Sequence, residues 1–203
     1  MPLHKNNVQV QSMKSSHPKG FTVIELMVTV MVMSITVMIA APGLKQTIQN
    51  NRVTTQANEL LAALNYARSE AVKRGVQVTV CKANLAANPG QCDKNANVFW
   101  ESGKIVFVDQ NTLGVIDAGG GGAGADTILR VYSGMPSGYT LRSGATFANW
   151  IAYLPSGASQ GSSGLSNDTF RMCPPNHDVK QARSIVLNAA GRPMVSKGAT
   201  QCP

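Results

Sequence analysis

The stretch Gly20-Phe21-Thr22-Val23-Ile24-Glu25-Leu26-Met27 marks the point where a short basic leader meets a long apolar run. From Phe21 to Ala41 the sequence reads FTVIELMVTVMVMSITVMIAA, and Glu25 is its one ionisable side chain. About 20 consecutive apolar residues allow a helix to span a hydrocarbon core of about 30 Å. The run therefore predicts a membrane-spanning helix at residues 21–41.

The leader, residues 1–20, carries Lys5, Lys14 and Lys19 and no acidic residue. By the positive-inside rule we expect it to stay in the cytoplasm, with the C-terminal part across the membrane. A secretory signal has a shorter apolar stretch with its cleavage site after it, whereas Gly20 precedes this run. Cleavage at Gly20 would leave the helix on the product.

Glu25 is unusual because a carboxylate inside a membrane helix costs about 2.5–3.5 kcal/mol on insertion scales. Such a group normally has a partner or a function. If a peptidase cuts after Gly20, the new ammonium of Phe21 lies near Glu25 of its own chain or of a neighbouring helix. That pair would set the register between subunits. The alternative is a Glu25 close enough to the interface to be solvated.

The junction Lys19-Gly20-Phe21-Thr22-Val23-Ile24-Glu25-Leu26, followed by an apolar helix and Pro42, resembles the N-terminus of type IV pilins and type II secretion pseudopilins. The resemblance implies cleavage between Gly20 and Phe21 by a prepilin peptidase and N-methylation of Phe21. It also implies storage in the bacterial inner membrane and assembly with other major and minor pilins or pseudopilins.

Beyond Pro42, apolar residues from Leu44 to Ala71 recur at three- and four-residue spacing, which predicts an amphipathic helix that ends at Gly75. Short β-type runs separated by Gly, Pro, Asn and Ser follow, which favours an antiparallel sheet. The expected class is α+β, with a long N-terminal helix packed on an antiparallel β-sheet head, the pilin fold. The expected parts are the leader 1–20, the membrane and filament-core helix 21–41, the amphipathic helix 42–75 and a periplasmic head 76–203. Within the head, Ala118 to Ala125 (AGGGGAGA) is expected to be a flexible loop, and the expected strands are 76–82, 104–109, 127–133, 139–142, 150–154, 169–173 and 184–188.

Two internal segments, Leu64 to Ala71 and Ile185 to Arg192, resemble the GspH/FimT family of minor pilins and pseudopilins. This resemblance implies a minor pilin that helps to prime assembly of a type IV pilus, at or near the filament tip. A type II secretion pseudopilin of the GspH type is the alternative, because both classes share the leader, the helix and the head.

The four cysteines, Cys81, Cys92, Cys173 and Cys202, all follow the membrane segment, in the part expected to face an oxidising periplasm. Two disulfides are expected among three possible pairings. Cys81 with Cys92 would close a hairpin-like loop, and Cys173 with Cys202 would fasten the C-terminal tail. The spacing contains no C-x2-C pair, so we expect no zinc site.

The sequence gives no support for an enzyme. His4 and His17 lie in the leader, which leaves His177 in a Pro-rich loop, and no serine or threonine has an evident base. The run from Gly119 to Gly122 lacks the Lys and Ser/Thr of a phosphate-binding loop. We expect neither a cofactor nor a resident metal.

The chain is basic, with a formal net charge of +8. Removing the three leader lysines from 18 basic residues leaves 15 against 10 acidic ones. A positive C-terminal surface would bind polyanions such as DNA in a salt-dependent way. Some FimT-type minor pilins bind DNA during natural transformation through a Gly-Arg-x-Arg motif, and here Gly191-Arg192-Pro193-Met194 has Met194 in the place of the second Arg. The candidate DNA-binding residues are Lys180, Arg183, Arg192 and Lys197, with Lys197 as the substitute for the second Arg. In the alternative interpretation, Gly191-Arg192 is only a turn common to the family and the basic residues form an ordinary solvated face. These residues could equally contact acidic lipid headgroups or a neighbouring pilin.

Overall fold

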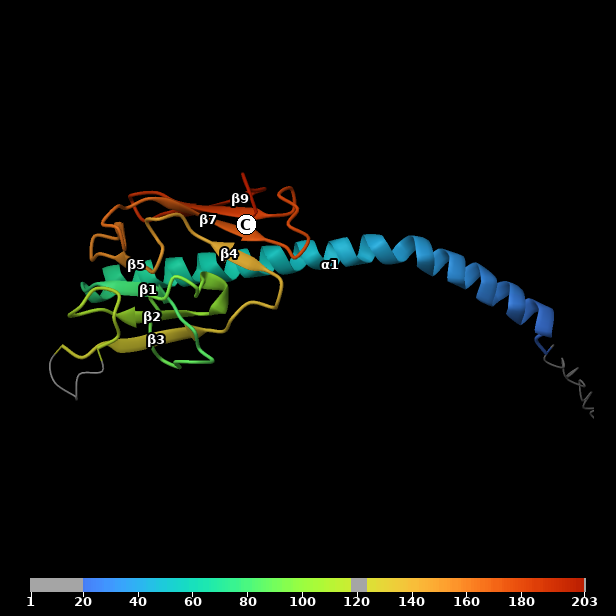
Figure 1. Ribbon diagram of the computed structural model, residues 1–203, viewed down its shortest axis with the longest axis horizontal. Coiled ribbons are helices and arrows are strands. Elements are labelled where there is room, and N and C mark those ends of the chain that lie inside the picture. Colours follow the sequence, from blue (N-terminus) through green and yellow to red (C-terminus); the bar gives the residue numbers. More distant parts are fainter. Residues whose placement is uncertain (1–19, 118–123, 203) are drawn as a thin grey trace, which may run out of the picture. The chain divides into compact units, whose positions relative to one another are not determined.

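The computed structural model describes residues 20–117 and 124–202 (Figure 1). The chain forms two compact units, one ending at Leu44 and the other beginning at Lys45. One helix, α1 (Val23–Arg74), contributes to both units and is continuous through Pro42. The expectations for the leader residues Lys5, Lys14, Lys19, His4 and His17, and for residues 118–123 of the glycine-rich loop, lie outside the described residues.

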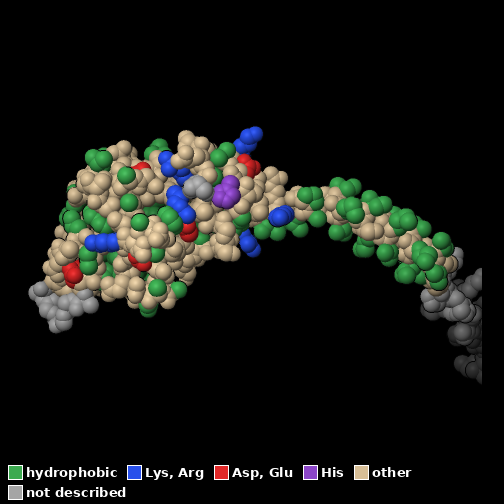
Figure 2. Space-filling model, in the orientation of Figure 1, with side chains coloured by type: hydrophobic (Ala, Val, Ile, Leu, Met, Phe, Trp, Pro, Cys, Tyr) green, Lys and Arg blue, Asp and Glu red, His purple; other side chains and the backbone are tan. Residues whose placement is uncertain are grey.

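The first unit is the N-terminal part of α1. Thr22 caps it, because its Oγ1 accepts a hydrogen bond from the backbone N–H of Glu25 at 3.3 Å. An 18-residue window of this helix has a mean hydropathy of 2.3, and none of the window is buried. Figure 2 shows hydrophobic side chains covering this unit.

In the second unit, α1 presents an apolar stripe at alternating spacings of three and four residues, which lies on one face of a helix. Leu44 and Ile48, which the sequence also assigned to the stripe, are instead exposed by 63% and 44%. The head therefore covers the helix only from Val53 onward. The buried stripe consists of Val53, Ala57, Leu60, Leu64, Ala67 and Ala71.

The strands form two antiparallel sheets rather than one. A five-stranded sheet has the order β3-β2-β1-β5-β6, and a four-stranded sheet has the order β4-β7-β8-β9. In Figure 1 strands flank the teal part of α1 on two sides. The bounds are β1 Val78–Lys82, β2 Lys104–Val108, β3 Thr127–Tyr132, β4 Thr140–Arg142, β5 Trp150–Tyr153, β6 Ser159–Gly161, β7 Asp168–Cys173, β8 Arg183–Leu187 and β9 Pro193–Lys197; a 3-10 helix, η1, spans Trp100–Ser102.

Two strands have no counterpart among those expected from sequence. Strand β6 reads Ser-Gln-Gly and is too short and polar to show a period of two. Strand β9 begins at Pro193 beside Gly191-Arg192, so its sequence is typical of a turn. Each of these strands pairs in an antiparallel hairpin with the strand directly before it, β6 with β5 and β9 with β8, and this pairing makes it a strand.

The main core lies between α1 and both sheets, and a smaller second cluster forms on the other face of the five-stranded sheet. In the second cluster the ring of Trp150 packs directly against Gly114, and a Cβ added at Gly114 would lie 2.0 Å from that ring. Gly114 also has a φ of 69°, so both the space and the backbone require glycine. Strands β1 and β2 are consequently buried on both faces.

Two disulfides are present, as the sequence predicts. Cys81 pairs with Cys92, and Cys173 pairs with Cys202. The first joins β1 to the loop that follows it, and the second fastens the C-terminal tail to β7. Closing loops of these lengths is expected to contribute about 3 kcal/mol each.

Candidate functional site: the N-terminal junction and the basic surfaces of the head

The N-terminal junction is fully accessible. Among the described residues beyond its chain neighbours, a Cβ added at Gly20 would meet no atom within 4 Å, and Phe21 is 78% exposed. Glu25 lies in the first turn of α1 and is exposed. Nothing within the described chain therefore shields the bond between Gly20 and Phe21.

Glu25 occupies a position that favours a carboxylate on local grounds as well. Thr22 and Glu25 have the spacing of a capping box, in which a Thr at the N-cap is followed three residues later by Glu. A negative charge in the first turn also interacts favourably with the helix dipole. The T-x-x-E spacing was readable from the sequence, and the sequence interpretation missed this role.

The polar side chains of the first unit satisfy their hydrogen bonds within the helix. The hydroxyls of Thr29, Ser34 and Thr36 each donate to a backbone carbonyl three or four residues earlier, at 2.8–2.9 Å. A helix with its hydroxyls bonded internally can lie in lipid without unsatisfied groups. Glu25 is then the one group of residues 21–41 that requires a partner outside the helix backbone.

Three of the four candidate DNA-binding residues, Lys180, Arg183 and Lys197, lie at one end of the β8–β9 hairpin, where the Gly198 N–H donates to the Ala182 carbonyl at 2.8 Å and the Ala199 N–H to the Val179 carbonyl at 3.0 Å. Arg183 is half-buried, and its guanidinium donates to the hydroxyl of Thr54 on α1 at 3.0 Å and to the carbonyls of Gln181 and Ala182. Arg183 therefore fastens β8 to α1. Lys197 lies opposite Arg183 in the register of β8 and β9 and is exposed.

Arg192 lies at the other end of the same hairpin, in the turn between β8 and β9. Five residues of extended strand separate it from Lys197, or about 16 Å at 3.3 Å per residue. Lys197 is thus farther along the chain from Arg192 than the second Arg of a Gly-Arg-x-Arg motif would be, and its role as a substitute for that Arg stays a prediction. On the face shown in Figure 2, basic side chains lie in several separate places on the head.

The backbone conformation and the close packing at position 191 require a glycine. Its φ is 74°, and an added Cβ would lie 2.2 Å from the carbonyl oxygen of Gly157. Arg68 of α1 binds the same region, donating to the carbonyl of Gly157 at 2.9 Å and to that of Ala190 at 3.2 Å. The Gly191-Arg192 turn is therefore packed against the end of α1, and Arg68 is a basic residue of this end that the sequence interpretation missed.

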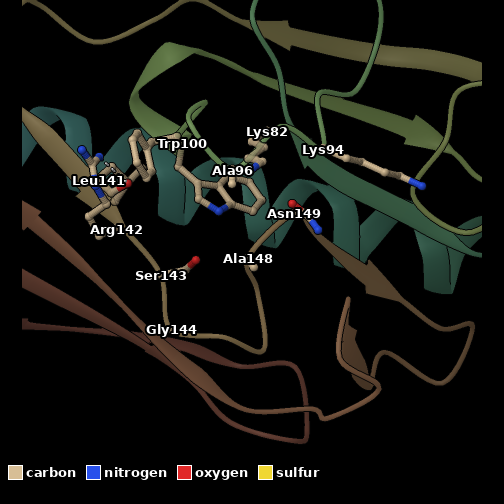
Figure 3. A pocket seen from close by; sticks show the side chains of 11 residues that line it. Lys82, Lys94, Ala96, Trp100, Leu141, Arg142, Ser143, Gly144, Ala148 and Asn149 are labelled. Atoms are coloured by element: carbon tan, nitrogen blue, oxygen red, sulfur yellow. Dashed lines mark hydrogen bonds between the residues drawn. The ribbon is translucent and has the colours of Figure 1, made fainter.

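A second basic site, here called the Lys82 pocket, lies at the ends of β1 and β4. It has a volume of about 350 Å³ (Figure 3). The loop after β1, the start of η1 and the loop between β4 and β5 complete its walls. Its lining residues are Lys82, Lys94, Ala96, Phe99, Trp100, Leu141, Arg142, Ser143, Gly144, Ala148 and Asn149.

Lys82 is the last residue of β1 and is only 4% exposed. Its Nζ donates to the carbonyl of Asn95 at 3.0 Å. Burial lowers the pKa of Lys82, and the charge of Asp93 acts in the opposite direction. No carboxylate among the described residues lies within ion-pair distance of Lys82.

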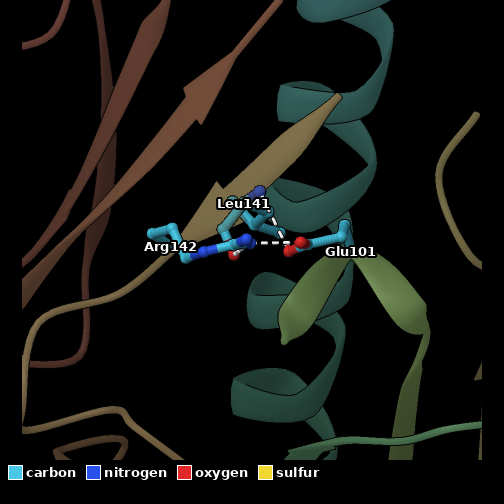
Figure 4. A network of polar contacts seen from close by, with 3 residues as sticks. All are labelled: Glu101, Leu141 and Arg142. Atoms are coloured by element: carbon cyan, nitrogen blue, oxygen red, sulfur yellow. Dashed lines mark hydrogen bonds and ion pairs between the residues drawn. The ribbon is translucent and has the colours of Figure 1, made fainter. Parts of the chain in front are cut away.

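Arg142 is held rigidly at the other side of the pocket. Its Nη1 forms an ion pair with Oε1 of Glu101, while Oε2 of Glu101 accepts from the backbone N–H of Leu141 at 3.2 Å (Figure 4). Its guanidinium also stacks on Phe99, 3.6 Å from the ring centroid. Because Lys82 and Arg142 are distant in sequence, no spacing signal predicts that they line the same pocket.

Comparisons with known proteins agree with this architecture. Residues 56–191 match the family model described as "Type II transport protein GspH", and residues 15–41 match the prokaryotic N-terminal methylation motif. Two crystal structures of the Pseudomonas aeruginosa type IV minor pilin FimU, in different space groups, are similar in fold, each at 22% sequence identity. Their TM-scores are 0.53 and 0.51. The two alignments cover 75% and 74% of this chain, and 96% and 99% of the FimU chains. A search of curated proteins gives no match.

Proposed function

This chain belongs to the GspH family, whose members are structural pilin and pseudopilin subunits, and from that premise we propose that it is a minor pilin of a type IV pilus. In this proposal the leader 1–20 is removed and Phe21 becomes the methylated N-terminus. Residues 21–41 then anchor the subunit in the inner membrane and later pack into the filament core, with the head on the periplasmic side.

The observation that carries the proposal is the exposed apolar helix joined to a disulfide-containing head. The 18-residue window with a mean hydropathy of 2.3 has no buried part, so its apolar surface requires lipid or other helices. The methylation motif spans the same segment. A helix that first lies in lipid and then among identical or related helices satisfies this requirement at both stages.

Glu25 has a defined role in the proposed filament. After cleavage, the Phe21 ammonium and the Glu25 carboxylate lie four residues apart, at the start of α1. In an apolar surrounding an unpaired Glu25 would be costly. Pairing with the ammonium of a neighbouring subunit would remove that cost and fix the relative depth of the two helices.

The proposal is tested by a Gly20→Val variant expressed in place of the wild type. A Cβ at position 20 would meet no atom of the described residues within 4 Å beyond its chain neighbours, so a loss of processing would report on peptidase recognition and not on misfolding of the head. We expect the variant to keep its leader and to be absent from sheared filaments. Gly43→Ala is the matched control, because it also meets no atom within 4 Å. Normal processing and incorporation of Gly20→Val would contradict the proposal.

A type II secretion pseudopilin is the second candidate, and the description of the matched family model favours it. The two functions differ in the consequence of deleting the gene. Loss of surface pili and twitching with intact protein secretion supports the pilin, whereas loss of secretion with intact pili supports the pseudopilin.

Priming of assembly at the filament tip and DNA binding are finer parts of the proposal. Lys180, Arg192 and Lys197 are exposed, and their side chains form no ion pair with any described residue, which supports weak, salt-dependent binding of polyanions. The full chain in detergent should bind a duplex oligonucleotide at low salt and lose it as salt rises. Binding that Arg192→Ala leaves unchanged would remove Arg192 from the DNA site.

A further inference from the structure

The Lys82 pocket has an unbalanced charge. The charged side chains that line it, Lys82, Lys94 and Arg142, are all basic. Glu101 forms an ion pair with Arg142, and the charge of Asp93 acts on Lys82 without an ion-pair contact, so neither acid lines the pocket. The pocket therefore presents positive charge without a lining carboxylate.

Lys82 provides the strongest indication of a missing partner. An ammonium has three donors, and within the described chain one of them is used, by the carbonyl of Asn95. The residue is 96% withdrawn from solvent, and a buried charge without an ion-pair partner is unfavourable. An anion in the pocket would supply that partner.

The walls of the pocket are fixed before any ligand arrives. The disulfide of Cys81 with Cys92 joins β1 to the loop that carries Lys94, and the Asp93 N–H donates to the Lys82 carbonyl at 2.9 Å. Glu101 and Phe99 immobilise Arg142. A preorganised site loses little entropy when it binds.

We propose that the Lys82 pocket binds the carboxylate side chain of an Asp or Glu from a neighbouring filament subunit. This inference rests on the proposed function, because it requires assembly with other pilins. The carboxylate lies against Lys82, its methylene groups contact the apolar wall of Trp100, Leu141 and Ala148, and Lys94 and Arg142 add positive charge to the lining. In Figure 3 Trp100 lies between Lys82 and Arg142, and Lys94 extends away from the other labelled side chains, toward the outside of the pocket.

A single carboxylate fits this site better than a nucleic acid does. Nonspecific DNA binding uses exposed cations along a track that follows many phosphates. Here one cation is buried and a second is held by Glu101. A pocket of about 350 Å³ has the size that takes a side chain or a small ligand, and it is not a groove along several phosphates.

The first test uses sheared filaments that contain the full chain. A carbodiimide joins an amine to a carboxylate only when the two are in contact, and mass spectrometry then identifies both peptides. We expect Lys94 to be joined to an Asp or Glu of another subunit. Lys94→Arg keeps the charge but cannot form the amide, so it should lose this cross-link and still enter filaments.

The second test measures incorporation of Lys82→Met with Lys94→Glu. Loss of a charge-assisted contact should lower the amount of chain in filaments at least about tenfold. Lys73→Glu is the matched control, since Lys73 is an exposed lysine in the last turn of α1, and it should change incorporation less than about twofold. Equal membrane levels of the variants, with both disulfides formed, show that each head has folded.

The outcomes separate this inference from the function on which it rests. Wild-type chain in filaments without a Lys94 cross-link, together with normal incorporation of the double variant, overturns the pocket and leaves the pilin. Absence of the wild-type chain from filaments overturns both. If the double variant loses oligonucleotide binding while its incorporation is unchanged, the occupant is nucleic acid and the proposal is wrong.

Discussion

The ion pair between Lys104 and Glu59 should show a large difference between removing one partner and removing both. Lys104 of β2 is 1% exposed, and its Nζ lies 3.2 Å from Oε1 of Glu59 on α1. Burial lowers the pKa of Lys104, and Glu59 opposes that change. Glu59→Leu would therefore leave an ammonium in the core without its counter-charge.

The expected magnitude follows from the geometry. Two unit charges 3.2 Å apart attract by about 5 kcal/mol at an effective dielectric constant of about 20. Because the Glu59 side chain is 32% exposed, solvent screens part of this, and we expect Glu59→Leu to cost about 2–3 kcal/mol. The double variant Glu59→Leu with Lys104→Met removes both charges and should lie within about 1 kcal/mol of the wild type.

The assay is urea unfolding of the full chain in detergent, followed by tryptophan fluorescence. Trp100 and Trp150 are both buried in the head, at 2% and 8% exposure, so the signal reports on that unit. Glu70→Leu is the matched control on the same helix, because its partner Arg74 is 43% exposed, and it should cost less than about 1 kcal/mol. A double variant as unstable as Glu59→Leu would refute the reasoning, since the cost would then not come from the unpaired ammonium.

Three further predictions concern the head. Replacing Cys173 and Cys202 by Ser should lower the free energy of unfolding of the head by about 3–4 kcal/mol. Replacing Cys81 and Cys92 should cost slightly less, because that pair is separated by 11 residues and the first pair by 29. The reverse order in urea midpoints would contradict the loop-closure argument. Gly191→Ala should lower the free energy of unfolding by about 2–4 kcal/mol, because the φ of Gly191 is 74° and an added Cβ would approach the Gly157 carbonyl oxygen. Gly164→Ala is the control, because Gly164 has a φ of 85° but an added Cβ there would meet no described atom within 4 Å, and it should cost about 1–2 kcal/mol. Equal costs would show that the Gly157 contact is unimportant. Burial raises the pKa of Asp109 in the folded head above its ordinary value of 3.8. At a pH between the pKa of the unfolded chain and the higher pKa of the folded head, the folded head binds more protons than the unfolded chain. The contribution of Asp109 to stability therefore improves as the pH falls. Asp109→Asn should thus be at least as stable as wild type at pH 7, and unfolding measured down to pH 4 should show its advantage shrinking; an advantage that grows would contradict the sign.

The sequence was most informative where composition alone determines structure. The run from Phe21 to Ala41 is apolar on all sides, so its helix and its exposure follow from length and hydropathy. The stripe from Val53 to Ala71 repeats at the period of a helix face. Leu44 and Ile48 continue that spacing but lie exposed, because periodicity does not indicate where the covering sheets end.

The basic sites were less predictable because they depend on pairing. Lys180, Arg183, Arg192 and Lys197 are close in sequence, yet the extended β9 places Arg192 and Lys197 at opposite ends of a hairpin. The Lys82 pocket shows the reverse case. Its basic residues are up to 60 positions apart, and the antiparallel sheets and a disulfide bring them together.

The central claim is that the chain is a processed and assembled pilin subunit. The most direct test is mass spectrometry of the chain's N-terminal peptide, taken from sheared filaments. The account predicts a mature chain that begins at Phe21 and carries one methyl group on its amine. A filament-associated chain that begins at Met1, or one cut after the apolar run near Ala41, would contradict it.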